Sequence, residues 1–378
     1  PAINPGKSGK NLLNAAWFLY EGKVQRTAYK TLLPTYDVFD EYRYFEPADQ
    51  WQVIEFKGHK IALTICEDIW NLGDHPLYRI CPMDKLQVQQ PDLMINISAS
   101  PFDYDHDDDR KEVIRANVLK YQLQIFYCNA VGAQTDLIFD GGSLVMDAKG
   151  HLVKELNYFE EDFAVLDLSD VQSTALSGSA APQKNLDREM RVSRLQDPGQ
   201  ILTYLTAEKN IAEIHQALIV GIRDYFRKMG FTKALIGVSG GIDSAVALVL
   251  ACEALGKEQV RGVLMPSQYS SSSSVTDAQE LCRNLGNPHD LLPIQEIYDS
   301  FLKTLKPVFG DLPFGLAEEN LQSRTRGNLL MALANKFGCI LLNTSNKSEL
   351  ATGYGTLYGD MAGGISVLGD VYKTQIYA

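Results

Sequence analysis

The first half of the chain alternates short apolar runs with longer stretches of mixed polarity. Apolar runs of strand length occupy residues 60–65, 92–97 and 124–128. Between the last two runs, residues 110–123 carry charges on one helical face and apolar side chains around the others. The pattern predicts strands joined by helices, with neighbouring strands in parallel or mixed pairing.

The second half repeats this α/β pattern after a change of character. Residues 173–182 are rich in small side chains, and residues 183–197 are polar with charges of both signs, which is typical of a linker. A long amphipathic helix is then predicted up to about residue 229, followed by an apolar run at 234–239 and a helix over 242–255. The predicted organisation is a first domain over 1–170, a linker over 171–205 and a second domain over 206–378.

The length and the charge of the chain narrow the classes of protein. A chain of 378 residues exceeds one typical core and suits two domains. The formal net charge of -12 argues against a general binder of nucleic acid or of membrane surfaces, although a local phosphate site remains compatible with it. No apolar run approaches the roughly 18 to 20 residues of a membrane span. We therefore expect small-molecule partners, no nucleic acid and no membrane.

The six cysteines are scattered and show no C-x-x-C spacing. A chain of this size does not need disulfides for stability, so the cysteine pattern predicts a protein of the reducing cytoplasm. No signal peptide is visible, but the first ten residues do not resemble a natural start. We expect the sequence to be incomplete at its beginning.

A glycine pair follows the apolar run of the second half. Residues 239–244 read Ser-Gly-Gly-Ile-Asp-Ser and lie between the predicted strand and the predicted helix. Such a turn directs free backbone N–H groups and the positive end of a helix dipole at one point, which favours an anion. A glycine pair at this place can also be an ordinary tight turn.

The same hexapeptide resembles the signature of the ATP pyrophosphatase class, which cleaves ATP between its α and β phosphates and adenylates a substrate. That resemblance implies that Asp243 coordinates magnesium, an ion that prefers carboxylate and phosphate oxygens. Asp243 can alternatively be an ordinary first-turn residue of the helix. The ATP-binding residues that the resemblance implies here are Ser239, Gly240, Gly241, Asp243 and Ser244.

Further motifs follow in a fixed order. They occupy residues 265–271, 319–326, 341–349, 353–360 and 370–374, the second leading into an apolar helix. Together they resemble the NAD synthetase family from about residue 206 to the last residue. The contacts that this resemblance implies are Met265, Thr344 and Lys373 for ATP, Asn320, Arg324, Glu349 and Asp360 for deamido-NAD, and Glu349 beside Asp243 for magnesium.

The residue types agree with these roles. Carboxylates bind magnesium, Arg324 can bind a phosphate through two N–H groups, and Lys373 adds a point charge. Either cation can alternatively be a surface charge of its helix.

Cys66 is the candidate nucleophile of the first half. It ends an apolar strand and precedes Glu67 and Asp68, which predicts an exposed polar setting unlike that of a structural cysteine. A lone cysteine is more often part of a core, so neighbouring motifs must support the assignment.

Those motifs occupy residues 29–34, 36–41, 64–70, 97–102 and 139–143. Together with Cys66 they resemble the carbon–nitrogen hydrolase (nitrilase) class, and specifically the glutaminase domains fused to NAD synthetases. The resemblance implies that Cys66 attacks the side-chain amide of glutamine and that Lys30 stabilises the oxyanion. A glutamate acts as general base in that class, and we expect it before the first residue of this sequence.

The resemblance also implies a glutamine-binding site. Its positions correspond to Tyr36, Glu67 and Ser100. The class has a basic residue six positions after Ser100, where this sequence has His106 within an acidic run. His106 is therefore either a substrate contact or a solvated loop histidine.

These resemblances imply the fold and the reaction. The expected fold is a nitrilase-like α-β-β-α sandwich followed by a Rossmann-like parallel sheet of the adenine nucleotide α-hydrolase type. The expected reaction is ATP-dependent amidation of deamido-NAD with ammonia from L-glutamine. We expect the complete enzyme to be a homo-oligomer and this sequence to be truncated at both ends. The alternatives are another glutamine-dependent amide-forming enzyme of the ATP pyrophosphatase class and a non-catalytic subunit that has kept the fold.

Overall fold

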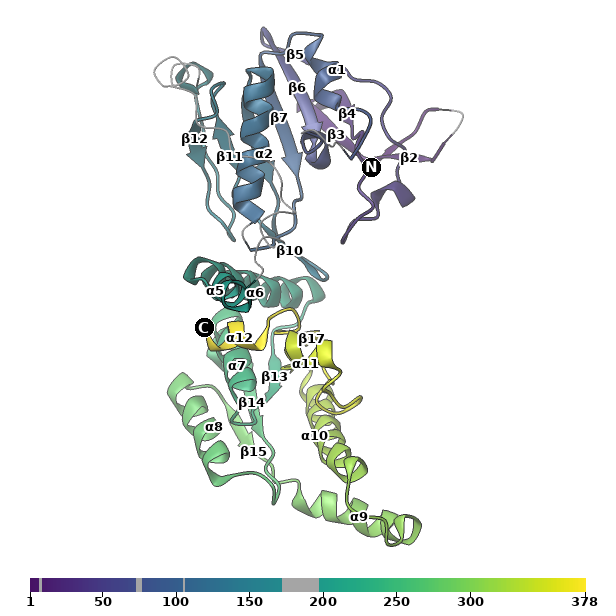
Figure 1. Ribbon diagram of the computed structural model, residues 1–378, viewed down its shortest axis with the longest axis vertical. Coiled ribbons are helices and arrows are strands. Elements are labelled where there is room, and N and C mark those ends of the chain that lie inside the picture. Colours follow the sequence, from purple (N-terminus) through teal and green to yellow (C-terminus); the bar gives the residue numbers. More distant parts are fainter. Residues whose placement is uncertain (7–8, 73–76, 105, 172–196) are drawn as a thin grey trace. The chain divides into compact units, whose positions relative to one another are not determined.

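The computed structural model describes residues 1–6, 9–72, 77–104, 106–171 and 197–378. The chain forms two compact units, shown in Figure 1. The first unit contains Pro1–Gly132 and Leu137–Arg194, and the second contains Ala133–Asp136 and Leu195–Ala378.

The first unit is built on a mixed sheet, in which the described strands have the order β12-β11-β8-β7-β6-β5. The three central strands β6, β7 and β8 are parallel, and the strands outside them are antiparallel to their neighbours. They include the three strands predicted from the apolar runs, which are thereby confirmed. The bounds are β5 (Ile54–Phe56), β6 (His59–Ile65), β7 (Leu93–Ser98), β8 (Gln124–Asn129), β11 (Leu144–Met146) and β12 (Leu152–Glu155).

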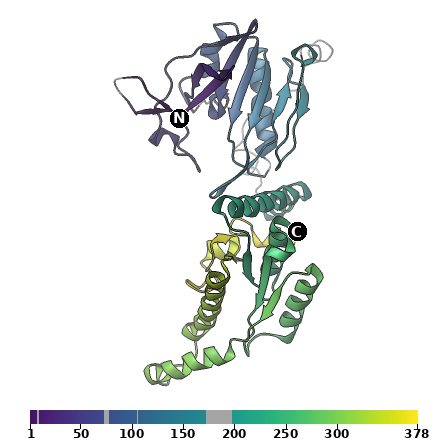
Figure 2. The same ribbon diagram turned by 180° about the vertical axis from the view of Figure 1, so that it is seen from behind.

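Helices cover one face of this sheet and a β-hairpin covers the other (Figures 1 and 2). Because successive strand residues point to opposite faces, Ala62 packs beneath the helices while Ile61 packs in the cluster that includes Phe18 of the hairpin. The elements of these layers are α1 (Pro82–Gln87) and α2 (His106–Tyr121) on one side and β3 (Ala15–Tyr20) and β4 (Lys23–Tyr29) on the other. The remaining short elements are β1 (Ala2–Ile3), β2 (Leu12–Leu13), η1 (Glu41–Arg43), η2 (Cys66–Ile69), β9 (Val131–Gln134) and β10 (Leu137–Asp140).

Helix α2 differs slightly from the predicted helix over 110–123. It begins at His106, because the aspartates that follow lie in its first turn, where negative charge favours the helix dipole. It ends at Tyr121, since Gln122 has a φ of 54° and cannot continue a right-handed helix. A buried ion pair fixes α2 to β10: Arg110 donates to both carboxylate oxygens of Asp140, at 2.9 and 2.5 Å.

The second unit contains a parallel sheet with the strand order β15-β14-β13-β16-β17. Strand β13 comes first along the chain and lies at the centre, so consecutive connections run outward to either side of it. The carboxyl ends of the strands at such a switch point form the usual ligand site of parallel sheets. The bounds are β13 (Ala234–Gly237), β14 (Val260–Leu264), β15 (His289–Leu291), β16 (Ile340–Asn343) and β17 (Ile365–Ser366).

Both faces of this sheet are covered by helices. Ala234 and Ile236 face a core shared with α6, α7, α8 and α12, whereas Leu235 faces a core shared with α10. The helix bounds are α5 (Pro198–Leu205), α6 (Glu208–Met229), α7 (Ile242–Leu255), α8 (Ser272–Leu285), α9 (Gln295–Phe309), α10 (Leu316–Phe337), α11 (Lys347–Thr352) and α12 (Lys373–Tyr377), with the 3-10 turn η3 (Lys257–Gln259).

Two helices depart from the sequence-based expectation. Residues 319–326 lie inside α10 and do not precede it, since Glu318 accepts from the backbone N–H of Gly315 and caps the helix earlier. Within the predicted linker, residues 198–205 form α5, and residues 172–196 lie outside the described part of the chain. No helix among the described residues has the length and apolar character needed to cross a bilayer.

Candidate active sites

Cys66 stands at the carboxyl end of β6 in a strained turn. It has a φ of 46°, a left-handed conformation that residues with a side chain rarely adopt, and it begins the short helical turn η2. The side-chain amide of Asn96, on the neighbouring strand β7, donates to the backbone oxygen of Cys66 at 3.4 Å. Strain of this kind is often kept at functional positions, which supports Cys66 as the candidate nucleophile.

The exposed polar setting predicted around Cys66 is wrong, because Glu67 and Asp68 are both buried. Asp68 accepts the backbone N–H groups of Thr31 and Leu32 at 3.0 Å, and Glu67 accepts the hydroxyl of Tyr36 at 2.8 Å. Both carboxylates are therefore satisfied by the segment that follows Lys30. They tie this segment to the turn that carries Cys66.

Lys30 lies immediately before this segment and directly after β4. Its side chain is buried and its ammonium forms an ion pair with the Glu41 carboxylate. Glu41 also accepts from the side-chain amide of Asn14 at 3.1 Å. Glu41 is thus engaged by two donors, which agrees with a role in holding Lys30.

Burial and charge act in opposite directions on the thiol. Burial raises the pKa of Cys66, and the nearby charge of Glu67 raises it further. The Lys30 ammonium and the hydroxyl of Ser98 act to lower the same pKa. Lys30 therefore favours the thiolate, the form of cysteine that reacts as a nucleophile.

Lys30→Met is expected to shift the alkylation of Cys66 by iodoacetamide to higher pH. Removal of the positive charge leaves burial and Glu67 opposed only by the hydroxyl of Ser98, so the pKa of Cys66 rises further and less thiolate is present at pH 8. Mass spectrometry of the Cys66 peptide at a series of pH values measures the shift. Lys23→Met changes an exposed lysine of the adjoining strand and is expected to leave the profile unchanged. Identical profiles for Lys30→Met and the unmodified protein contradict the coupling.

Ser100 and His106 lie together, as their shared assignment requires. The hydroxyl of Ser100 is 3.2 Å from Nε2 of His106, and the imidazole stacks on the Trp70 indole with ring centroids 5.4 Å apart. His106 is 8% exposed, so the alternative of a solvated loop histidine is wrong. Trp70 was not assigned to the site from the sequence. It directly follows η2, the turn that begins at Cys66, and its ring stacks on that of His106.

In the second unit, residues 239–244 form a closed turn between β13 and α7. Ser244 Oγ accepts the N–H of Ser239 at 3.1 Å, and Ser239 Oγ accepts the N–H of Gly241 at 3.2 Å. Gly240 has a φ of +85°, and a Cβ there would lie 2.3 Å from the backbone oxygen of Ser274 on α8. Only glycine fits this position, so the turn has no side chain where it approaches the backbone of α8.

Asp243 and Glu349 are brought together by one buried residue, Asn346. Asn346 Nδ2 donates to Asp243 Oδ1 at 3.1 Å, and the backbone N–H of Asn346 donates to Glu349 Oε2 at 3.1 Å. Lys373 forms an ion pair with the other oxygen of Asp243. Asn346 caps α11 through the N–H of Glu349 at 3.0 Å, which explains why it faces both carboxylates.

Asp243 and Glu349 are the candidate ligands of a magnesium ion. The described residues contain no group of three or more His, Cys, Asp and Glu side chains that could hold a metal ion. Two carboxylates on either side of Asn346 supply hard oxygen ligands, and magnesium commonly completes such a pair with waters and phosphate oxygens. The residues therefore fit the ion as a partner of bound phosphate.

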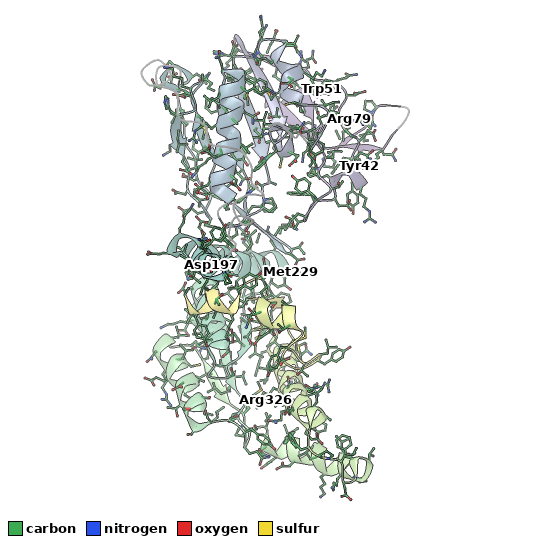
Figure 3. The ribbon with its side chains drawn as sticks, in the orientation of Figure 1. Tyr42, Trp51, Arg79, Asp197, Met229 and Arg326 are labelled. Carbon is green, nitrogen blue, oxygen red and sulfur yellow. The ribbon has the colours of Figure 1, made fainter. Side chains whose placement is uncertain are left out.

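A cavity of about 410 Å³ lies at the carboxyl ends of β13, β14 and β16. Its lining contains four of the predicted site residues: Ser239, Met265, Thr344 and Asp360. It also contains Arg326, labelled in Figure 3, which was not assigned to the site from the sequence. The predicted residues outside this lining are Gly240, Gly241, Asp243, Ser244, Asn320, Arg324, Glu349 and Lys373.

Asn320, Arg324 and Asp360 belong to one contact between α10 and the loop over 353–362. Asn320 accepts the Thr356 hydroxyl at 2.9 Å, and Asp360 accepts the Thr356 N–H at 2.6 Å. Arg324 is exposed and donates through Nε to the backbone oxygen of Leu357 at 3.2 Å. Three of the four residues predicted to bind deamido-NAD thus lie on one surface.

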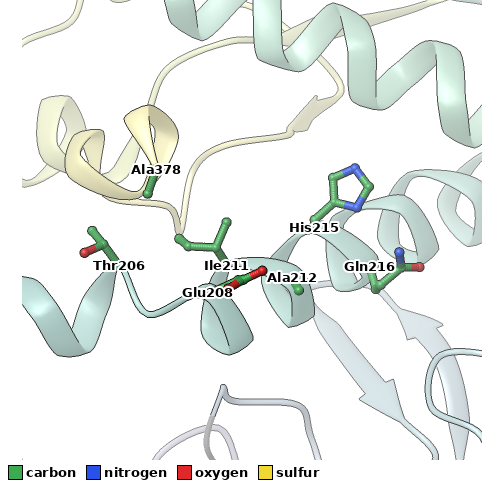
Figure 4. A pocket seen from close by; sticks show the side chains of 7 residues that line it. All are labelled: Thr206, Glu208, Ile211, Ala212, His215, Gln216 and Ala378. Atoms are coloured by element: carbon green, nitrogen blue, oxygen red, sulfur yellow. The ribbon is translucent and has the colours of Figure 1, made fainter.

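A second cavity, of about 460 Å³, is lined mainly by α6 and is shown in Figure 4. Its residues include Glu208, His215 and Ala378, and none of the predicted site residues. His215 is paired with Glu253 at 2.9 Å, which agrees with a surface contact.

Comparison with known proteins shows which family this chain resembles. The family model described as NAD synthase matches residues 214–378. The glutamine-dependent NAD(+) synthetases of Synechocystis sp. and Thermotoga maritima are 44% and 42% identical to this chain, over 97% and 98% of it and 62% and 65% of their own lengths. The chain thus spans less than two thirds of these relatives.

Solved structures of glutamine-dependent NAD(+) synthetases also match this chain. The glutamine-dependent NAD+ synthetase of Acinetobacter baumannii, in complex with ADP, matches with a TM-score of 0.83 and 38% identity, over 99% of this chain and 65% of that one. The corresponding enzyme of Cytophaga hutchinsonii matches with a TM-score of 0.76 and 19% identity, over 96% of this chain and 64% of that one, and so shows the fold alone. The predicted α/β fold class, in two units of which the second contains a parallel sheet, is confirmed. Over nearly its whole length this chain is similar to glutamine-dependent NAD(+) synthetases, and its residues 214–378 match the NAD synthase family model.

Proposed function

We propose that the protein of which this chain is part converts deamido-NAD to NAD with ATP and L-glutamine. The observation that carries the proposal is the pairing, in one chain, of a strained Cys66 beside buried Lys30 with a glycine turn beside Asp243 and Glu349. The first arrangement suits attack on an amide, and the second suits a nucleotide phosphate.

In the first unit, the Cys66 thiolate attacks the side-chain carbonyl carbon of glutamine and Lys30 stabilises the oxyanion. The carbon–nitrogen bond breaks, ammonia leaves, and a γ-glutamyl thioester remains on the sulfur. Water then cleaves the thioester and releases glutamate. The proton transfers need a general base, for which we propose a glutamate outside this sequence, since Glu41 is bound to Lys30 and Glu67 to Tyr36.

We propose that Tyr36, Glu67, Ser100 and His106 bind the glutamine substrate. The hydroxyl of Tyr36 and the carboxylate of Glu67 are already hydrogen-bonded to each other, as are Ser100 and His106. These pairs hold donors and acceptors in fixed positions, which favours one orientation of a small polar substrate.

In the second unit, the nicotinate carboxylate of deamido-NAD attacks the α phosphorus of ATP, and pyrophosphate leaves. Ammonia then attacks the activated carbonyl carbon, AMP leaves with the carboxylate oxygen, and NAD is formed. We propose that ATP is held by Ser239, Gly240, Gly241, Asp243, Ser244, Met265, Thr344 and Lys373, and deamido-NAD by Asn320, Arg324, Glu349 and Asp360. Asp243 and Glu349 would hold magnesium, which offsets negative charge on the phosphates.

We also propose a cytoplasmic homo-oligomer. All six cysteines are free thiols, which supports a reducing compartment. The exposed apolar side chains Val308, Phe314 and Leu316 in the second unit support self-association. Light scattering of the complete protein measures its mass in solution, and a monomer contradicts this part.

The decisive experiment uses the complete protein with deamido-NAD, ATP and magnesium, and with either glutamine or ammonium as nitrogen donor. Formation of NAD, AMP and pyrophosphate in equal amounts is expected with both donors. If neither donor yields NAD, the proposed acceptor is wrong and another carboxylate substrate of an ATP-dependent amide-forming enzyme must be sought.

A further inference from the structure

Arg326 lies on the cavity-facing side of α10. Ser323, Gly327 and Leu330 line the same cavity, and their spacing of three and four residues defines one helical face. Arg324, two residues earlier, is rotated by roughly 200° around the helix axis at 3.6 residues per turn. It is exposed and reaches the loop over 353–362, so the two arginines serve different surfaces.

The guanidinium of Arg326 is incompletely paired for a partly buried cation. Its Nε donates to the backbone oxygen of Met265 at 3.0 Å, and its Nη2 lies 3.5 Å from Ser267 Oγ. Within the parts of the chain that the structure describes, Arg326 forms no ion pair. Burial lowers the pKa of its guanidinium, with no carboxylate acting to raise it. Five N–H donors on a permanently charged group thus meet two neutral acceptors.

The cavity lining holds one carboxylate, Asp360, which forms no ion pair with Arg326 in the described parts of the chain. Its charged lining residues are Arg326 and Asp360, and the Asp360 carboxylate accepts the N–H of Thr356 at 2.6 Å. The lining also contains Ser239, which begins the glycine turn before α7. Burial of a cation without a counter-ion costs free energy, and an anion bound in the cavity would offset the charge of Arg326.

We propose that Arg326 is a further nucleotide-binding residue, whose guanidinium binds a phosphate oxygen of ATP. The assignment to ATP rests on the proposed function. It is favoured over deamido-NAD because Arg326 contacts Met265 and Ser267, at the end of β14, and shares a cavity with Ser239. The residues proposed for deamido-NAD on α10 face the loop over 353–362 instead.

Calorimetric binding to the complete protein tests this. Arg326→Gln is expected to weaken the binding of ATP about tenfold or more, since a charge-assisted contact to phosphate is lost. Adenosine, which has the same base and sugar without phosphate, is expected to bind equally to both proteins, as is deamido-NAD. Arg326→Lys keeps the charge and is expected to restore part of the ATP affinity.

Lys336→Gln is the matched control, because it removes an exposed cation of the same helix and is expected to bind ATP like the unmodified protein. Equal weakening of ATP and adenosine would mean that Arg326 only positions the loop after β14, and would overturn the proposal. Weakened binding of deamido-NAD alone, or unchanged binding of ATP, overturns it as well. These are binding measurements, so a protein that binds ATP but forms no NAD refutes the proposed function and leaves Arg326 assigned.

Discussion

Cys66→Ala is expected to remove NAD formation from glutamine, by about 1000-fold or more, and to leave NAD formation from ammonium unchanged. In the proposed glutaminase reaction the sulfur forms the covalent intermediate, and no neighbouring side chain can replace it. Ammonium is expected to bypass this step, since the proposed reaction of the second unit needs only ammonia. Alanine adds no new backbone strain, because the cysteine already has a side chain at a φ of 46°.

The measurement compares the initial rates of NAD formation by the complete protein with each nitrogen donor. Cys128→Ala is the control, because Cys128 is an exposed cysteine on β8 of the same unit. Its rates are expected to equal those of the unmodified protein with both donors. Retention of glutamine-supported activity by Cys66→Ala is the result that would falsify the nucleophile assignment.

Gly240→Ala is expected to lower NAD formation from both donors together, by about 100-fold or more. The methyl group would lie 2.3 Å from the backbone oxygen of Ser274, and the φ of +85° is unfavourable for alanine by about 1 to 2 kcal/mol. The backbone of α8 or the glycine turn must therefore move. Because the turn is proposed to present its N–H groups to a phosphate, a displacement of about 1 Å is enough to cost this much activity.

Gly230→Ala is the control that separates the backbone strain of a positive φ from a steric clash. Gly230 ends α6 with a φ of +75°, and a Cβ there would meet no atom within 4 Å. This variant is expected to unfold at a slightly lower temperature and to keep its activity with both donors. If Gly240→Ala keeps its activity as well, or loses only the glutamine-supported part, the turn is not the phosphate site.

The local elements were predictable where the pattern was strong. The strands over 60–65, 92–97 and 124–128 and the helix over 242–255 are present because apolar runs bounded by polar residues have few other ways to bury their side chains. The bounds of α2 and α10 were less predictable. They depend on Gln122, whose φ is positive, and on Glu318, which caps its helix, and neither feature is visible in an apolar pattern.

The burial of the residues next to Cys66 could not be predicted from their order along the chain. Two carboxylates after a cysteine predict a polar surface, yet Glu67 and Asp68 are buried because the segment after Lys30 supplies hydroxyl and N–H donors to them. That segment is distant along the sequence. Burial of a charge depends on such partners, so only the tertiary structure could decide it.

The sequence by itself predicted the class of chemistry, because the motifs around Cys66 and Lys30 and the glycine turn with Asp243 resemble those of known families. The tertiary structure decided which side chains meet. Asn346 joins Asp243 to Glu349, and Arg326 faces the cavity while Arg324, two residues away, does not. Local pattern specifies the elements, whereas packing selects the face of each helix and the partner of each charge, and these depend on residues far apart along the chain.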